Sequence, residues 1–234
     1  MHAGHKTPLA TLLFCTLIIS PSAQADNERR ALSGFTAIEA ESGLNVDIRI
    51  GDDFLVEVDS GDEDLADIET EVRNGTLQLS IDRDDWDWGD WQDDYHVSIV
   101  MPALEEIEAS GGVDVRVLGT VTGDEFNLDA SGGADVEVDV AVTRIEIEVS
   151  GGADVDISGT AETAIARTSG GADLDARNLE ARHADLRASG GADLSMGVIE
   201  TLEARASGGA DIDYYGDPEV LDEDASGSSD IRGH

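Results

Sequence analysis

The chain has 234 residues and carries 52 Asp and Glu against 14 Lys and Arg, which gives a formal net charge of −38 at pH 7. A surface this acidic repels nucleic acid and anionic membranes, so both are excluded as partners. The length suits one elongated domain or one to two compact domains, and the single Cys excludes a disulfide framework.

Residues 1–25 have the pattern of a secretory signal peptide. Lys6 precedes an apolar run at residues 9–20, and a small-x-small site at residues 23–25 stands directly before Asp26. The run is too short to span a bilayer as a permanent helix, and no later apolar segment is long enough. We therefore expect a protein that is exported to the periplasm, the outer surface or the medium, without a transmembrane anchor.

Residues 26–105 contain short segments in which apolar and polar side chains alternate, which is the period of half-buried strands. Asn74-Gly75 predicts a tight hairpin turn, and Ser42-Gly43 resembles a degenerate first copy of the repeat that follows. We expect this part to form an antiparallel cap over one end of a repeat structure at 106–234, within one continuous domain. The alternating segments are 35–38, 46–50, 54–58, 77–81 and 97–101.

The most singular segment is 82–95, an acidic stretch between two predicted strands that holds all three Trp of the chain. Exposed Trp side chains stack on sugar rings or anchor a protein partner. The alternative is a long hairpin whose Trp side chains fold back over the cap. This segment is our candidate for a specific ligand contact, through Trp86, Trp88, Trp91 and Tyr95.

A Ser-Gly-Gly-Ala-Asp motif recurs every 18–21 residues in the rest of the chain. The residues three and one before the Ser, and three and five after it, are mostly apolar or small, whereas those between are mostly charged. This period of two predicts a strand, a glycine corner and a second strand in every copy. The copies begin at Ser110, Ser131, Ser150, Ser169, Ser189, Ser207 and Ser226, and the last relaxes the motif.

Copies of this kind stack as parallel coils about 4.8 Å apart. We therefore expect an all-β fold, a single-chain β-solenoid or β-helix of coils of about 19 residues, with a narrow interior that suits the Ala of the motif. The alternative is an antiparallel sandwich, which would place turns about every 8–12 residues and needs no fixed corner motif.

The Asp of the motif forms an outward column in this fold, with one carboxylate per coil. The glycine-rich nonapeptide of calcium-binding repeat proteins has a different period and a different glycine pattern. We therefore expect diffuse cation condensation, with weakly bound calcium at discrete sites as the alternative, and no other cofactor. The cation candidates are Asp135, Asp154, Asp173, Asp193 and Asp211.

Arg167, Arg187 and Arg205 occupy a second outward column, two residues before the motif Ser. Their guanidinium groups could hold an acidic sugar or a phosphate. The interpretation we prefer is ordinary surface pairing, because Asp185 and Glu203 lie two residues away on the same face.

Nothing in the sequence localises an active site. Residues 26–234 contain three His, and neither a Gly-x-Ser-x-Gly motif nor a metal-binding His spacing is present. A nucleophilic Ser is needed once, whereas the motif Ser occurs seven times. Solenoid enzymes that cleave polysaccharides use carboxylates on an outer face, so a carbohydrate-active enzyme stays an alternative.

Four motifs occur together in chain order: Phe35-x-x-Ile38 with Val46-Asp-Ile48, Asn74-Gly75-Thr-Leu77, Met101-Pro102-x-Leu104, and Tyr214-Tyr215-Gly216-Asp217-Pro218 with Ser226-Gly227-Ser228. Together they resemble the GIN-domain family, a domain of unknown function described as the head domain of autotransporter adhesins. The resemblance covers about residues 33–232 and implies an all-β solenoid in the cell envelope, without an established activity. Two features depart from the family: Ser-Gly-Gly-Ala-Asp stands where Ser-Gly-Ser-Gly is usual, and the Trp-rich segment is particular to this chain.

The sequence therefore predicts an exported, non-enzymatic β-solenoid of the cell envelope that acts by surface contact. Its partner would be a glycan or a cell-surface protein, bound through residues 82–95. The alternatives are a carbohydrate-active enzyme on the same scaffold and a purely structural or cation-binding envelope protein.

Overall fold

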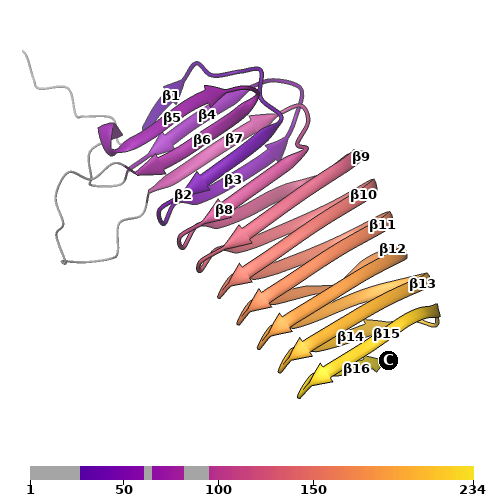
Figure 1. The fold of residues 1–234 in the computed structure, drawn as a ribbon. Helices are drawn as coiled ribbons and strands as arrows, with labels where there is room; N and C mark the ends of the chain where they lie inside the picture. The colour runs from indigo at the N-terminus through magenta and orange to yellow at the C-terminus, as the bar shows by residue number, and fades with distance from the viewer. Residues whose placement is uncertain (1–26, 61–64, 82–94) are drawn as a thin grey trace, which may run out of the picture.

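The computed structural model describes residues 27–60, 65–81 and 95–234, which form one long stack of β-strands (Figure 1). The first part of the stack contains β1 (Asn27–Arg30), β2 (Ala37–Glu41), β3 (Asn45–Ile50), β4 (Leu55–Asp59), the 3-10 turn η1 (Leu65–Asp67), β5 (Ile68–Arg73), β6 (Thr76–Ile81), β7 (His96–Met101) and β8 (Glu106–Ser110). The second part contains β9 (Asp114–Ser131), β10 (Asp135–Gly151), β11 (Asp154–Gly170), β12 (Asp173–Gly190), β13 (Asp193–Gly208), β14 (Asp211–Tyr215), β15 (Glu219–Gly227) and β16 (Asp230–Gly233). Within the described ranges, no helix has the length and apolar character needed to cross a membrane.

Each of the strands β9 to β13 makes one coil of a parallel solenoid. Neighbouring coils pair in register, so that Asp135 lies beside Asp154 and Ser150 lies beside Ser169. Along each strand the chain bends and returns, which gives the stack two faces joined by a corner on one side and a bend on the other (Figure 1). The predicted β-solenoid of coils of about 19 residues is confirmed, and the antiparallel sandwich is excluded for the repeat part.

The corner depends on the first Gly of each motif. Gly170 has φ +83°, and a Cβ at this position would lie 2.9 Å from the backbone oxygen of Gly151 in the preceding coil. The amide of Gly171 donates a hydrogen bond of 2.8 Å to the same oxygen. Only a residue without a side chain combines this left-handed backbone with such a close approach.

The interior of the repeat part is narrow and apolar. The Ala that follows each corner is fully buried, at 0% exposure in Ala134, Ala153, Ala172, Ala192 and Ala210. The next inward column is aliphatic and also buried; it contains Val136, Val155, Leu174, Leu194 and Ile212. The same residue types therefore stack on themselves from coil to coil, and each column is sealed by the coils above and below.

The inner strands of the N-terminal part continue the parallel stacking of the solenoid, and only its outermost strands form a cap. β2, β3, β6, β7 and β8 pair in parallel with one another or with β9. Asn45 lies beside Asp114, and Ser42 and Gly43 have φ values of +71° and +73°. Ser42-Gly43 is thus a corner in register with the repeats, as its sequence predicts.

The outermost strands of this end are antiparallel. β1 pairs with β4, β4 pairs with β7, and β5 pairs with β6. The hairpin between β5 and β6 turns at Asn74-Gly75, with φ values of +52° and +90°. The predicted antiparallel cap is confirmed, and it is confined to the outer strands.

Candidate functional site

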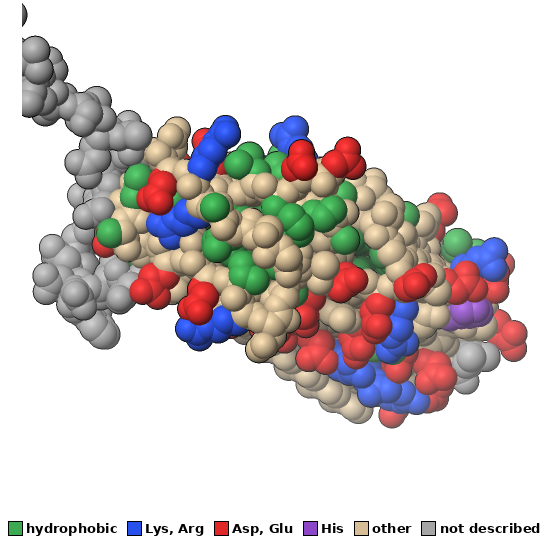
Figure 2. Space-filling model, turned by 90° about the horizontal axis from the view of Figure 1, so that it is seen from above, with side chains coloured by type: hydrophobic (Ala, Val, Ile, Leu, Met, Phe, Trp, Pro, Cys, Tyr) green, Lys and Arg blue, Asp and Glu red, His purple; other side chains and the backbone are tan. Residues whose placement is uncertain are grey.

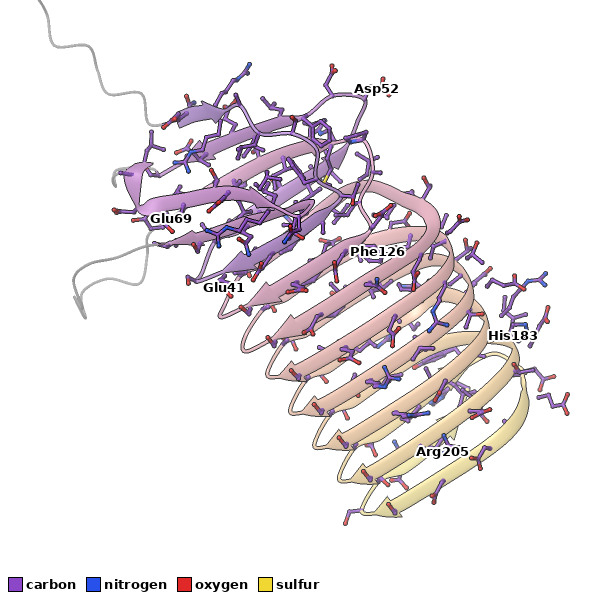
Figure 3. All side chains as sticks on the ribbon, turned by 45° about the horizontal axis from the view of Figure 1, so that its top comes forward. Glu41, Asp52, Glu69, Phe126, His183 and Arg205 are labelled. Atoms are coloured by element: carbon purple, nitrogen blue, oxygen red, sulfur yellow. The ribbon has the colours of Figure 1, made fainter. Side chains whose placement is uncertain are left out.

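The two faces of the repeat part present different charged columns to solvent. We call the outward side of the segments that end at each motif Ser the Arg face; these segments are 106–110, 125–131, 144–150, 163–169, 183–189, 201–207 and 222–226. We call the outward side of the segments that begin at each motif Asp the Asp face; these segments are 114–118, 135–139, 154–158, 173–177, 193–197, 211–215 and 230–233. Figure 3 shows Arg205 on the Arg face near the C-terminal end of the stack, and His183 at the bend.

Coil register places three Arg side by side on the Arg face. Arg167 lies beside Arg187, and Arg187 lies beside Arg205. From Glu108 to Asp224, the other members of the same column are Asp129 and Glu148. The three Arg therefore interrupt a column that is otherwise acidic.

Each of these Arg has carboxylate partners. Arg167 Nη1 lies 2.8 Å from Glu146 Oε1 and 3.0 Å from Glu148 Oε1. Arg187 forms a two-pronged contact with Asp185, with Nε 3.2 Å from Oδ1 and Nη2 2.8 Å from Oδ2. These contacts confirm that surface pairing, as preferred from the sequence, is the arrangement of the column.

Arg205 shows what the sequence pattern did not reveal. It contacts Glu203 at 3.7 Å, as the spacing suggested, but it also bonds Asp222 of the next coil. The hydrogen bond to Asp222 is the main reason that the pKa of Arg205 is raised. Glu146, likewise one coil away from Arg167, has a lowered pKa, first because it accepts a hydrogen bond from Arg167. Partners in adjacent coils could be found from sequence only by aligning the whole set of columns.

A shallow open groove of about 550 Å³ follows these residues along the solenoid axis. Arg167, Arg187 and Arg205 lie along it, Asp129 and Asp224 stand near its ends, and the motif Ser side chains of the same coils line it. The three Arg side chains are 39%, 47% and 40% exposed, so their pairs are open to solvent and to an incoming ligand. The groove therefore offers guanidinium donors, carboxylate acceptors and hydroxyl groups in repeated, parallel positions.

In the acidic part of the same column, burial and neighbouring carboxylates raise the pKa values of two side chains. Asp129 has a raised pKa, first because of burial and then because of the negative charge of Glu148. Glu108 has a raised pKa for the same reasons, with Glu106, Glu39 and Asp129 as the neighbouring charges. Carboxylates stacked in this part of the column therefore raise one another's pKa values, in addition to the effect of burial.

On the Asp face, coil register brings the motif Asp residues into one outward column, as predicted: Asp114, Asp135, Asp154, Asp173, Asp193, Asp211 and Asp230. Burial and then the charge of Asp114 raise the pKa of Asp135, and burial and then the charges of Asp193 and Asp154 raise the pKa of Asp173. Among the described residues, no group of His, Cys, Asp and Glu has the arrangement of a metal site.

Paired Arg side chains occur on the Asp face near each of its two ends and at one position between them. Arg116 pairs with Glu137 at 3.0 Å near the N-terminal end, and Arg232 pairs with Asp230 at 2.6 Å near the C-terminal end. Between them, Arg177 pairs with Asp175 at 2.8 Å. The cation candidates Asp135, Asp154, Asp173 and Asp193 are in no ion pair of the described chain, whereas the fifth, Asp211, lies 3.5 Å from Arg232. Figure 2 shows acidic and basic side chains interleaved over one side of the repeat part.

The Trp-rich segment can be placed only at its last residue. Trp86, Trp88 and Trp91 lie outside the described residues. Tyr95 is 1% exposed and belongs to the core, and its hydroxyl lies 3.2 Å from Asp67 Oδ2. The structure therefore assigns Tyr95 to the packing of the cap, and its side chain has no surface to offer a ligand.

Comparison with known proteins gives one family. The family model described as "Putative auto-transporter adhesin, head GIN domain" matches residues 34–218. A search of curated proteins found no match.

Solved structures share the fold at low sequence identity. A putative adhesin from Bacteroides fragilis is 23% identical over 89% of this chain and 96% of its own, with a TM-score of 0.82. A putative adhesin from Parabacteroides merdae is 15% identical over 89% of this chain and 95% of its own, with a TM-score of 0.70. A putative lipid binding protein from Parabacteroides distasonis is 17% identical over 90% of this chain and 97% of its own, with a TM-score of 0.68.

Proposed function

Because the chain belongs to the family described as "Putative auto-transporter adhesin, head GIN domain", we propose that it is an exported, non-enzymatic adhesin-type protein that binds a neutral glycan along the Arg face. The observation that carries the proposal is the axial groove, in which three coils present the same Arg and Ser positions in register. Two structural neighbours that are also described as putative adhesins support the general role.

The geometry suits an extended chain molecule that lies parallel to the solenoid axis. Coils repeat about every 4.8 Å, so a ligand with a repeating unit meets the same donors and acceptors at each step. Sugar hydroxyls both donate and accept, which matches a lining of guanidinium, carboxylate and hydroxyl groups. When several units of the ligand bind at the same time, their individually weak contacts together give a higher overall affinity.

Charge selects a neutral ligand over an anionic one. Each Arg in the groove is already matched by at least one carboxylate, and Asp129 and Asp224 add negative charge at the two ends. The whole chain carries −38. An acidic polysaccharide would meet repulsion at every approach, whereas exposed ion pairs cost little to exchange for neutral hydroxyl groups.

The repeated chemistry also supports a non-enzymatic role. An active site needs particular groups once, with pKa values that are driven apart. In the described residues, raised pKa values occur at several positions on both faces, in Glu108, Asp129, Asp135, Asp156 and Asp173.

The test is binding of the full chain to an immobilised panel of neutral and acidic glycans. We expect binding to neutral glycans, and at least tenfold weaker binding after the triple substitution Arg167→Gln, Arg187→Gln and Arg205→Gln. The matched control is Arg116→Gln, Arg177→Gln and Arg232→Gln, which removes the same charge from the Asp face and should leave binding unchanged. Equal loss in both triple variants, or no loss in the first, would contradict a site on the Arg face.

The contact predicted for Trp86, Trp88 and Trp91 needs its own arm of the experiment. Replacing all three by Ala should weaken binding if the segment contributes to the same ligand. Unchanged binding would remove the segment from the proposal and leave the Arg face alone. Release of reducing ends from any bound glycan would overturn the non-enzymatic role.

A further inference from the structure

The last coil departs from the repeat at positions that face inward. The inward column three residues before the motif Ser holds Ile147, Ala166, Leu186 and Ala204 in the preceding coils, and in the last coil it holds Glu223. The aliphatic members of this column are fully buried. A carboxylate at this position is compatible with the fold only if no further coil covers it, because a buried charge without a partner is strongly unfavourable.

The structure shows that Glu223 is uncovered. β15 pairs with β13 on one side, and within the described residues nothing pairs with its other edge. Glu223 is exposed, and it has no ion pair in the described chain. Its neighbour in the preceding coil, Ala204, is 0% exposed.

The corner of the last coil is also altered. Ser229 stands where the preceding coils have a fully buried Ala. Its hydroxyl lies 2.8 Å from the backbone oxygen of Ser226 and 3.1 Å from that of Ala206. The single hydroxyl hydrogen can be donated to one of these carbonyl oxygens at the corner itself, whereas the Ala of an inner coil offers only a methyl group to the next coil.

The edge of β15 is irregular as well. Its register against β13 shifts between Leu202 and Glu203, where β15 has one extra residue. Pro218 stands directly before the strand and cannot donate a backbone hydrogen bond. Bulges, proline and inward-pointing charges are the devices with which sheet proteins prevent edge-to-edge pairing.

Part of the edge is nevertheless apolar. Val220 is 39% exposed, and Ile231 is only partly buried against the core. Both lie in columns whose earlier members are buried, such as Leu202 and Ile212. Without the charge at Glu223, this end would be a parallel two-layered edge with an apolar centre, ready to pair with a matching edge.

We propose that the last coil is a terminator, and that Glu223 prevents a second copy of the chain from pairing with it end to end. The matching partner is the same coil of a second molecule, because the opposite end of the stack finishes in the antiparallel strands β1 and β5, which do not repeat the columns of the last coil. A two-fold arrangement would place the two Glu223 side chains against the same apolar centre, where neither has a cation to pair with.

The test is the oligomeric state of the full chain by light scattering and sedimentation across a wide concentration range. The unmodified protein should remain a monomer. Glu223→Ala, which copies the residue found at Ala166 and Ala204, should fold normally and associate to a dimer in a concentration-dependent way. Glu223→Leu should associate at least tenfold more tightly than Glu223→Ala, because it restores the larger aliphatic member of the column.

Asp224→Ala is the matched control, since it removes one charge from the adjacent position on the outward side of the same strand. It should stay monomeric. A monomeric Glu223→Leu variant that melts cooperatively would overturn the proposal, and so would dimerisation of the unmodified protein. Equal association of Asp224→Ala would show that net charge, rather than the inward position, keeps the end free.

Discussion

The Arg face and the Asp face are made by the same coils, yet several carboxylates of the first are paired with Arg, whereas most motif Asp residues of the second lie beside other carboxylates. On the Arg face, Arg167, Arg187 and Arg205 replace acidic residues in three consecutive copies, and each is paired. On the Asp face, the same three coils keep Asp154, Asp173 and Asp193 in the motif column. Because the coils stack in register, each side chain lies beside the equivalent side chains of the two adjacent coils, and its charge acts directly on theirs.

The difference between the two faces changes the pKa values of their carboxyl groups. The pKa of Glu146 is lowered because Arg167 donates to it, whereas the pKa of Asp173 is raised by burial and by two neighbouring carboxylates. Two like charges about 5 Å apart in water repel by about 0.8 kcal/mol. A column of such pairs is tolerated because the buried interior and the backbone ladders stabilise the coils independently of their surface.

The largest effect should come from the corner that holds both faces in register. Gly170→Val should destabilise the protein by about 3 kcal/mol or more, because a side chain at φ +83° is strained and its Cβ would lie 2.9 Å from the oxygen of Gly151. Thermal unfolding measures this, at about 2–4 °C of melting temperature per kcal/mol for a chain of this size.

Gly171→Ala is the matched control for the corner. The second Gly has no positive φ, and its Cβ would lie 3.7 Å from the oxygen of Gly151, an ordinary contact. We expect a change of less than about 1 kcal/mol. Similar losses at Gly170 and Gly171 would mean that the corner is held by something other than the backbone of the first Gly.

An intermediate effect should come from titrating the two faces. Asp135, Asp156 and Asp173 have raised pKa values in the folded protein, so the folded state takes up protons more readily than the unfolded chain. Their contribution to stability is complete below the ordinary Asp value and is lost as pH rises through the raised values. Glu146 acts in the opposite sense, and its contribution is lost as pH falls through its lowered pKa.

The melting temperature should therefore rise as pH falls from neutral into the range in which the raised carboxyl groups take up protons, and fall again in stronger acid. Added NaCl at neutral pH should also raise it, because salt screens the repulsion along the Asp face. The double variant Asp154→Asn and Asp173→Asn should reduce both responses. A flat profile between neutral pH and the range in which carboxyl groups titrate would contradict the origin we assign to the raised values.

Calcium distinguishes diffuse screening from discrete sites in the same experiment. At matched ionic strength, diffuse condensation predicts a similar shift for millimolar CaCl₂ and for NaCl. A saturable calcium shift that disappears in the double Asn variant would show discrete sites at the Asp column.

The sequence predicted the repeat part well because its information is local. The residues before and after each motif Ser show the strand period and the corner within one copy, and the constant motif spacing gives the register between neighbouring copies, such as Ser150 beside Ser169. The partly parallel N-terminal end was not predictable in this way. There β3 pairs with both β7 and β9, and residues as distant as Val46 and Val115 lie side by side. Tyr95 shows the same limit: its position beside the Trp residues suggested exposure, whereas its contact with Asp67 is made by folding.

The smallest effects should come from exchanging the charge patterns of the two faces. Asp154→Arg places one Arg between Asp135 and Asp173, and so copies the Arg face within the Asp column. We expect it to stabilise the protein by about 0.5 kcal/mol, the range of exposed ion pairs, and to raise the melting temperature measurably at low salt only.

The reverse change is Arg187→Gln, which removes the two-pronged contact with Asp185 but also relieves repulsion from Arg167 and Arg205. Its cost should be smaller than about 0.5 kcal/mol, because a gain and a loss nearly cancel. The asymmetry between the two substitutions is the test, since Asp154→Arg relieves repulsion and adds attraction together. If Asp154→Arg instead lowered the melting temperature in the presence of calcium and not in its absence, the Asp column would be holding a cation that the new Arg displaces.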